Sequence, residues 1–112
     1  MTEKERIIAV DLDGTLTKDG ISKEFFWNST PKELIERYDE VEPNRDMIDY
    51  VNKLYDEGNT IYIFTSRNDA YQAQIHKWLK RNGVSFHFFI CNKPYFDLLI
   101  DDKAMRPEEC VK

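Results

Sequence analysis

The chain has few cysteines, no long apolar run and no excess of basic residues, and each absence excludes a class of protein. Its two cysteines form no Cys-x-x-Cys pair and have no histidine at ligand spacing, which excludes a zinc or dithiol motif. The apolar runs are too short for a membrane span or a signal peptide. The formal net charge of −5 argues against a general nucleic-acid binder, which needs a basic patch. We therefore expect a cytoplasmic protein with no membrane or nucleic-acid partner.

Strand-like and helix-like segments alternate along a length that suits a single domain over residues 1–112. We expect strands at about 6–11, 60–65, 85–90 and 97–100, and helices at about 31–38, 44–58 and 69–82. This order predicts an α/β fold with a short, mainly parallel sheet. The step from the third to the fourth strand conflicts with that prediction, because a parallel return normally needs about a dozen or more residues. The charged tail after Pro107 is expected to be loose.

An insert at about residues 18–42 separates the first strand from the first long helix. We expect it to form a flap and a short helix, with Thr30 as the N-cap and Pro31 at the first helical position. The insert also carries three consecutive aromatic residues, Phe25-Phe26-Trp27. A small domain cannot bury all three, so we expect them to serve a lid or a subunit contact.

Polar side chains follow all the predicted strands, and the carboxyl ends of parallel strands are where ligands bind in such sheets. These residues are Asp11, Asp13, Thr65, Ser66, Arg67, Lys93, Asp101 and Asp102. Carboxylates suit Mg²⁺, while a lysine and a hydroxyl suit phosphoryl oxygens. An ionised aspartate can also attack phosphorus and form an aspartyl-phosphate. The pattern predicts metal-assisted phosphoryl transfer.

The stretch Asp11-Leu12-Asp13-Gly14-Thr15, followed in order by Thr65, Lys93 and Asp101-Asp102, resembles the four signatures of the haloacid dehalogenase (HAD) superfamily phosphatases. The resemblance implies a three-layer Rossmann-like fold, with Asp11 as nucleophile and Asp13 as general acid and base. It implies that Thr65 and Lys93 hold the phosphoryl group. The implied Mg²⁺ ligands are Asp11, the backbone carbonyl of Asp13, Asp101 and Asp102, the last directly or through water.

The insert is too short for the large cap domains of that superfamily. By analogy with other capless members, this implies either a large substrate or a homo-oligomer, a dimer or tetramer, that covers the site. Small phosphatases of polysaccharide biosynthesis have such a build, so a sugar phosphate is the leading substrate, with Arg67 and Ser66 as candidate substrate-binding residues. Three alternatives stay open: a signalling phospho-acceptor domain, a non-catalytic binding protein, and a phosphatase acting on a macromolecule.

Overall fold

The computed structural model describes residues 6–20 and 22–111, without the side chain of residue 23. The charged N-terminal segment 1–5 therefore lies outside the described residues. Three strands form one parallel sheet in the order β1-β2-β3. They are β1 (Ile7–Asp11), β2 (Thr60–Phe64) and β3 (Phe88–Ile90). The predicted α/β class and parallel sheet are confirmed.

The third strand begins later than predicted, at Phe88 rather than at residue 85. The reason lies in His87, whose Nδ1 accepts a 3.1 Å hydrogen bond from the backbone N–H of Ile61. Just before it, the backbone N–H of Ser85 donates to the side chain of Asn52 at 2.8 Å. The backbone N–H of His87 still donates to the carbonyl of Ile61 at 2.9 Å, but side chains satisfy the N–H groups of Ile61 and Ser85, and the strand begins only at Phe88.

The predicted fourth strand at 97–100 is wrong. Within the described residues, none between β3 and the last helix forms a strand, and nothing pairs with the outer edge of β1. Leu98, Leu99 and Ile100 are 68%, 50% and 89% exposed. The short step after β3 explains the error, because six residues cannot carry the chain back to the start of a parallel strand.

Five α-helices accompany the sheet in the described residues: α1 (Lys23–Asn28), α2 (Pro31–Glu40), α3 (Arg45–Asp56), α4 (Gln72–Arg81) and α5 (Pro107–Cys110). The predicted cap of α2 is confirmed, since Thr30 and Glu33 form a reciprocal capping box and Pro31 follows. Asn44 caps α3 by accepting from the N–H of Met47 at 3.3 Å. A short 3-10 helix, η2 (Asp69–Tyr71), leads into α4 and is capped by Asn68.

The tail is more ordered than predicted, because it forms α5, which packs against α3. Cys110 and Val111 lie against the hydrophobic core. A signal for this helix was present in the sequence: Pro107 stands at the first helical position, and the side chain of Glu109 accepts from the backbone N–H of Arg106 at 2.8 Å.

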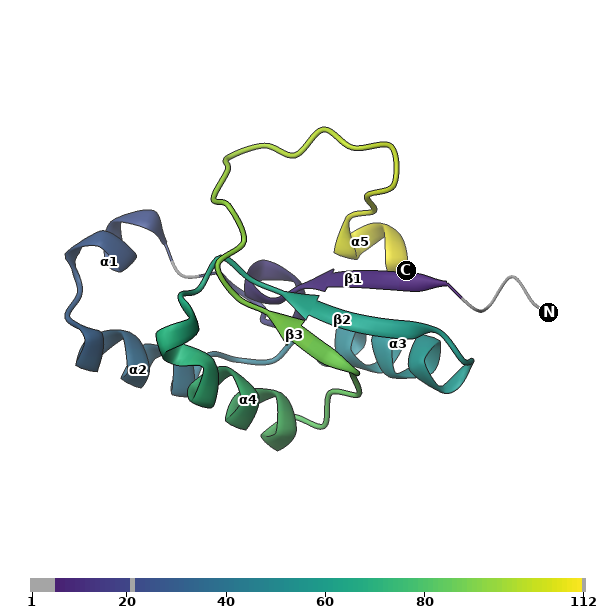
Figure 1. Cartoon of the computed structure of the whole chain (residues 1–112), viewed down its shortest axis with the longest axis horizontal. Coiled ribbons are helices and arrows are strands. Elements are labelled where there is room, and N and C mark those ends of the chain that lie inside the picture. Colours follow the sequence, from purple (N-terminus) through teal and green to yellow (C-terminus); the bar gives the residue numbers. More distant parts are fainter. Residues whose placement is uncertain (1–5, 21, 112) are drawn as a thin grey trace.

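The insert leaves the domain and returns to it at the same place. The N–H of Lys18 donates to the carbonyl of Glu42 at 2.8 Å, and the N–H of Asn44 donates to the carbonyl of Leu16 at 2.8 Å. Between these points α1 protrudes, with Phe25 and Trp27 exposed, whereas α2 packs against α4 (Figure 1). The insert is therefore partly structural; the expectation that its aromatic residues form a lid or a subunit contact stays a prediction.

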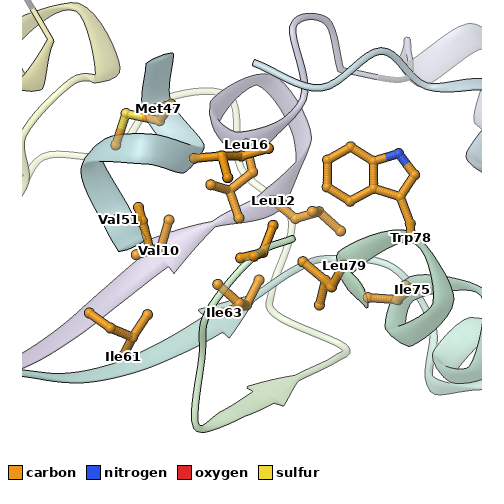
Figure 2. Packing of buried hydrophobic residues seen from close by; sticks show 12 residues of the cluster. Val10, Leu12, Leu16, Met47, Val51, Ile61, Ile63, Ile75, Trp78 and Leu79 are labelled. Atoms are coloured by element: carbon orange, nitrogen blue, oxygen red, sulfur yellow. The ribbon is translucent and has the colours of Figure 1, made fainter. Parts of the chain in front are cut away.

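The core lies between one face of the sheet and helices α3 and α4. Its strand residues include Val10, Ile61 and Ile63, which Figure 2 shows grouped with the apolar side chains of both helices. On the other face, Phe88 and Ile90 of β3 stay exposed, and the segment 91–106 and α5 lie on the side of β1 in Figure 1. In the described residues, none of the helices has the length and apolar character of a membrane span.

Candidate functional site

Two acidic residues stand at the carboxyl end of β1, as predicted. Asp11 is the last residue of the strand, and Asp13 lies in the tight turn η1 (Leu12–Leu16) that follows. Gly14 adopts φ 80°, a left-handed conformation that glycine accepts without strain. Its N–H donates to the hydroxyl of the buried Thr17 at 2.9 Å, which closes the turn. The turn thus carries two carboxylates on a fixed backbone.

Asp11 is paired with a lysine from the far end of the chain. The Nζ of Lys93 lies 2.9 Å from Asp11 Oδ1, and the hydroxyl of Thr15 lies 3.4 Å from Oδ2. Burial raises the pKa of Asp11; the hydrogen bond and charge of Lys93 oppose that rise, and the charge of Asp13 adds to it. Lys93 also stands over the ring of Phe64, 4.1 Å from its centroid. Asp11 is therefore a partly accessible acid beside a mostly buried cation.

Backbone hydrogen bonds hold the lysine in this position. The N–H of Lys93 donates to the carbonyl of Thr65 at 2.9 Å, and the N–H of Asn92 donates to the carbonyl of Arg67 at 2.9 Å. Asn92 adopts φ 63°, a region where asparagine is several-fold enriched. The chain leaving β3 is thus tied to the chain leaving β2, and Lys93 is brought to Asp11 as the sequence predicted.

Asp13 has a cation of its own. The Nε of Arg67 lies 3.1 Å from Asp13 Oδ2, and Nη2 lies 2.5 Å from Oδ1. Arg67 is only 4% exposed, and its guanidinium lies 3.7 Å from the centre of the Tyr38 ring. The hydroxyl of the buried Thr65 lies 3.4 Å from Asp13 Oδ2. The sequence predicted Arg67 as a substrate contact; the structure places it inside the protein, on Asp13.

Ser66, the other predicted substrate contact, is exposed just after β2. Its position leaves it accessible from solvent beside the buried Thr65. The prediction for Ser66 is therefore compatible with the geometry, whereas the prediction for Arg67 would require its guanidinium to leave Asp13.

Asp101 and Asp102 are exposed in the segment 91–106, and of the two only Asp101 lines a cavity with Asp11. It lines, together with Asp11 and Thr15, a cavity of about 630 Å³ that runs along β1. Asp101 Oδ1 accepts from the N–H of Lys103 at 2.8 Å, within its own turn. Among the described residues, no three histidine, cysteine or acidic side chains are gathered closely enough to hold a metal ion. The donors have the chemistry that Mg²⁺ prefers, but the predicted ligand set is not assembled.

The cavity opens on the sheet face that carries the Asp11 side chain. Asp11 pairs in register with Phe64, so both side chains point to the same face. Phe64, Tyr62 and Leu99 line the cavity as well. A substrate that reached Asp11 by this route would therefore pass an apolar wall before it met Asp11 and Asp101.

Two contributors to the site, Tyr38 and Phe64, carry no recognisable signal in the sequence pattern. Tyr38 and Leu34 lie four residues apart on α2, which predicts a buried helix face but does not reveal that Tyr38 meets an arginine. Phe64 appeared only as part of the predicted strand at 60–65. The contact of Phe64 with Lys93 depends on which segments are neighbours in the sheet, and the pattern of a single strand does not show this.

Comparison with known proteins supports the fold. No family model matches the chain, and no curated protein matches it significantly. A crystal structure of a target protein from Vibrio cholerae is similar, with a TM-score of 0.73 and 28% identity over 94% of this chain and 86% of that one. That protein carries no functional name, so the likeness bears on the architecture alone.

Proposed function

We propose that the protein is a phosphatase that hydrolyses a phosphate monoester through a phosphorylated Asp11. The observation that carries this proposal is the Asp11–Lys93 pair, 2.9 Å apart at the carboxyl end of β1, of which Asp11 also lines a cavity. The carboxylate supplies a nucleophile, and the ammonium group supplies a positive charge for the phosphoryl oxygens. Asp13 and Thr65 stand beside them on the same sheet edge.

In the proposed reaction a carboxylate oxygen of Asp11 attacks phosphorus and the bond from phosphorus to the ester oxygen breaks. The leaving alkoxide would take a proton from Asp13, which must bind that proton and turn away from Arg67 before this step. Asp13, now ionised, then removes a proton from water, whose oxygen attacks phosphorus and releases phosphate from Asp11. Lys93 would stay with the phosphoryl oxygens in both steps, and the Thr65 hydroxyl would turn from Asp13 to donate to one of them.

Mg²⁺ is the metal we propose for this site, with Asp11 and Asp101 as its side-chain ligands. Both carboxylates line one cavity, and hard oxygen donors are what Mg²⁺ prefers. Bound there, it would offset the repulsion between a phosphate and Asp11. We propose a sugar phosphate or a related metabolite as the substrate, because the cavity is open and a small molecule can enter it.

The deciding experiment measures phosphate release from a panel of monoesters, with Mg²⁺ and with chelator. We expect turnover with Mg²⁺ in the wild type and none in Asp11→Asn, since an amide cannot attack phosphorus. Asp56→Asn is the matched control, because Asp56 is exposed at the end of α3, before β2 begins. Turnover that survived in Asp11→Asn would refute the proposal. Phosphorylation of Asp11 without turnover would instead favour a signalling phospho-acceptor.

A further inference from the structure

The ammonium group of Lys93 has two aromatic rings beside it. Its Nζ stands 4.1 Å from the centre of the Phe64 ring and 5.2 Å from the centre of the Phe96 ring. Both distances are within the roughly 6 Å at which a ring face attracts a cation. The third neighbour is Asp11, whose Oδ1 accepts a hydrogen bond from Nζ at 2.9 Å. Two rings and one carboxylate therefore surround the cation of the proposed site.

The two rings come from parts of the fold with different support. Phe64 is the last residue of β2, is half-buried and pairs in register with Asp11. Phe96 lies in the loop after β3, three residues beyond Lys93, and is 42% exposed. The sheet thus fixes the Phe64 ring, whereas the Phe96 ring meets Lys93 from the loop. Phe96 can also be replaced at little cost in stability, because substitutions of exposed residues seldom cost much.

Rings attract a cation without binding its N–H groups one by one. A lysine ammonium has three N–H donors, and in the described part of the chain only Asp11 offers an oxygen that accepts from Nζ. A ring face attracts the charge as a whole, so it does not tie up a donor as a second carboxylate would. The Lys93 side chain is only 14% exposed, so the rings replace part of the water that would otherwise surround its charge.

The position of Nζ suits a group that is bonded to Asp11. Because Nζ is 2.9 Å from one carboxylate oxygen, a phosphoryl group on Asp11 would lie next to the ammonium. The donors that Asp11 does not use could then reach phosphoryl oxygens, where fixed positive charge stabilises the transition state. Lys93 can do this only while it stays at Asp11 and does not swing out into water.

We propose that Phe96 is a positioning residue whose ring face keeps the Lys93 ammonium at Asp11, with Phe64 as the fixed ring beside it. This inference rests on the proposed function. It assigns Phe96 no contact with the substrate and no contact with the metal. It gives the loop after β3 a task that is separate from the role proposed for Asp101.

The test changes the charge distribution of the ring while keeping its shape. Phe96 is replaced in the full chain by phenylalanines that carry one, two and three fluorine atoms, since each fluorine weakens the attraction of the ring face for a cation. We measure kcat/KM for p-nitrophenyl phosphate with Mg²⁺. The constant should fall step by step, by about two- to fivefold for the trifluoro residue and for Phe96→Leu, the scale of an exposed cation–ring contact. Phe96→Trp keeps a ring and should keep the activity.

Phe88 is the matched control, because it is 48% exposed and stacks on Tyr62 rather than beside a cation. The same fluorinated residues at position 88, and Phe88→Leu, should leave kcat/KM unchanged. A flat series at position 96, or an equal fall at position 88, would overturn the positioning role while the phosphatase proposal stood.

A spectroscopic readout works without turnover and so separates this inference from the proposed function. Protons above a ring face resonate upfield, so the ε-methylene protons of Lys93 should lie upfield of those of the exposed Lys80. Phe96→Leu should move them part of the way back, and Phe88→Leu should not. If no ester is hydrolysed while this shift is present, the phosphatase proposal fails and the ring contact is structural only. If Phe96→Leu leaves the Lys93 signal unmoved, the positioning role fails whatever the activity.

Discussion

The two sides of Asp11 are built in opposite ways. On the β2 side, Asp13, Arg67 and Tyr38 make contacts between segments that are far apart in the sequence, and both Arg67 and Tyr38 are buried. On the tail side, Asp101 and Asp97 are bonded to residues two positions away, Lys103 and Tyr95. Contacts between distant segments fix a side chain relative to the whole fold, whereas local contacts fix it only relative to its own loop. Asp13 is therefore fixed relative to the fold, and the proposed second metal ligand is not.

The two sides also differ in how tightly their residues are packed. The β2 side adjoins the core, in which Thr65, Ile63 and Ile75 have no exposed surface. The tail side is the part of the loop 91–106 that follows Lys93, and this loop has no helix or strand of its own. Loops longer than about 12–15 residues are uncommon in small domains, and they are often functional. Segments with few buried apolar contacts are also the ones that open most easily.

The largest effect we predict is on stability, and it compares one residue from each side. Tyr38→Ala should lower the free energy of unfolding by about 3–5 kcal/mol, as for other buried aromatic residues, because it leaves a cavity beneath Arg67. Leu98→Ala should change it by less than about 0.5 kcal/mol, because Leu98 is 68% exposed. Urea unfolding of both variants measures the difference. A cost for Leu98→Ala near that of Tyr38→Ala would mean that the loop is packed as firmly as the core.

A smaller effect concerns the metal. Mg²⁺ should slow hydrogen exchange of the backbone amides at residues 97–103 and leave that of β2 unchanged. Binding would restrict the loop, whereas β2 is already held by the sheet and the core. Asp101→Asn should weaken this Mg²⁺ response about 10-fold or more, and EDTA should reverse it. Asp97→Asn is the matched control, since Asp97 lies in the same loop but does not line the cavity. A response that is equal in both variants would remove Asp101 from the proposed metal site.

Much of the β2 side could be predicted from the sequence. Alternating strands and helices place Thr65, Lys93 and the acids after β1 at one sheet edge, and the structure brings Asp11 to Lys93 and Asp13 to Thr65. The role of Arg67 could not be predicted, because a position in a loop does not reveal a carboxylate 54 residues earlier in the chain.

The tail side was predicted less well, for a different physical reason. The run Leu98-Leu99-Ile100 has the composition of a strand, but a strand also needs a partner and a connection long enough to reach it. The segment has neither in the described residues. The helix α5 was missed because its capping signal, Pro107 and Glu109, stands in a stretch whose charge suggests a loose tail.

The smallest effect we predict is a pH dependence at Asp11, where the two sides meet. Burial raises the pKa of this carboxyl above its ordinary value of 3.8, and Lys93 opposes the rise. Between the ordinary and the raised value, the folded protein holds a proton that the unfolded chain has released. The contribution of Asp11 to stability is therefore full below 3.8 and is lost as the pH rises through the raised pKa.

Two measurements test the predicted direction of the pKa shift and of the change in stability with pH. Carboxyl NMR should place the midpoint of Asp11 above 3.8, and Lys93→Met should move it higher, because the cation that favours the ionised form is gone. Unfolding measured against pH should show a fall in stability across this interval in the wild type that is absent in Asp11→Asn. A midpoint below 3.8 would mean that the attraction of Lys93 for the ionised carboxylate outweighs the cost of burying it.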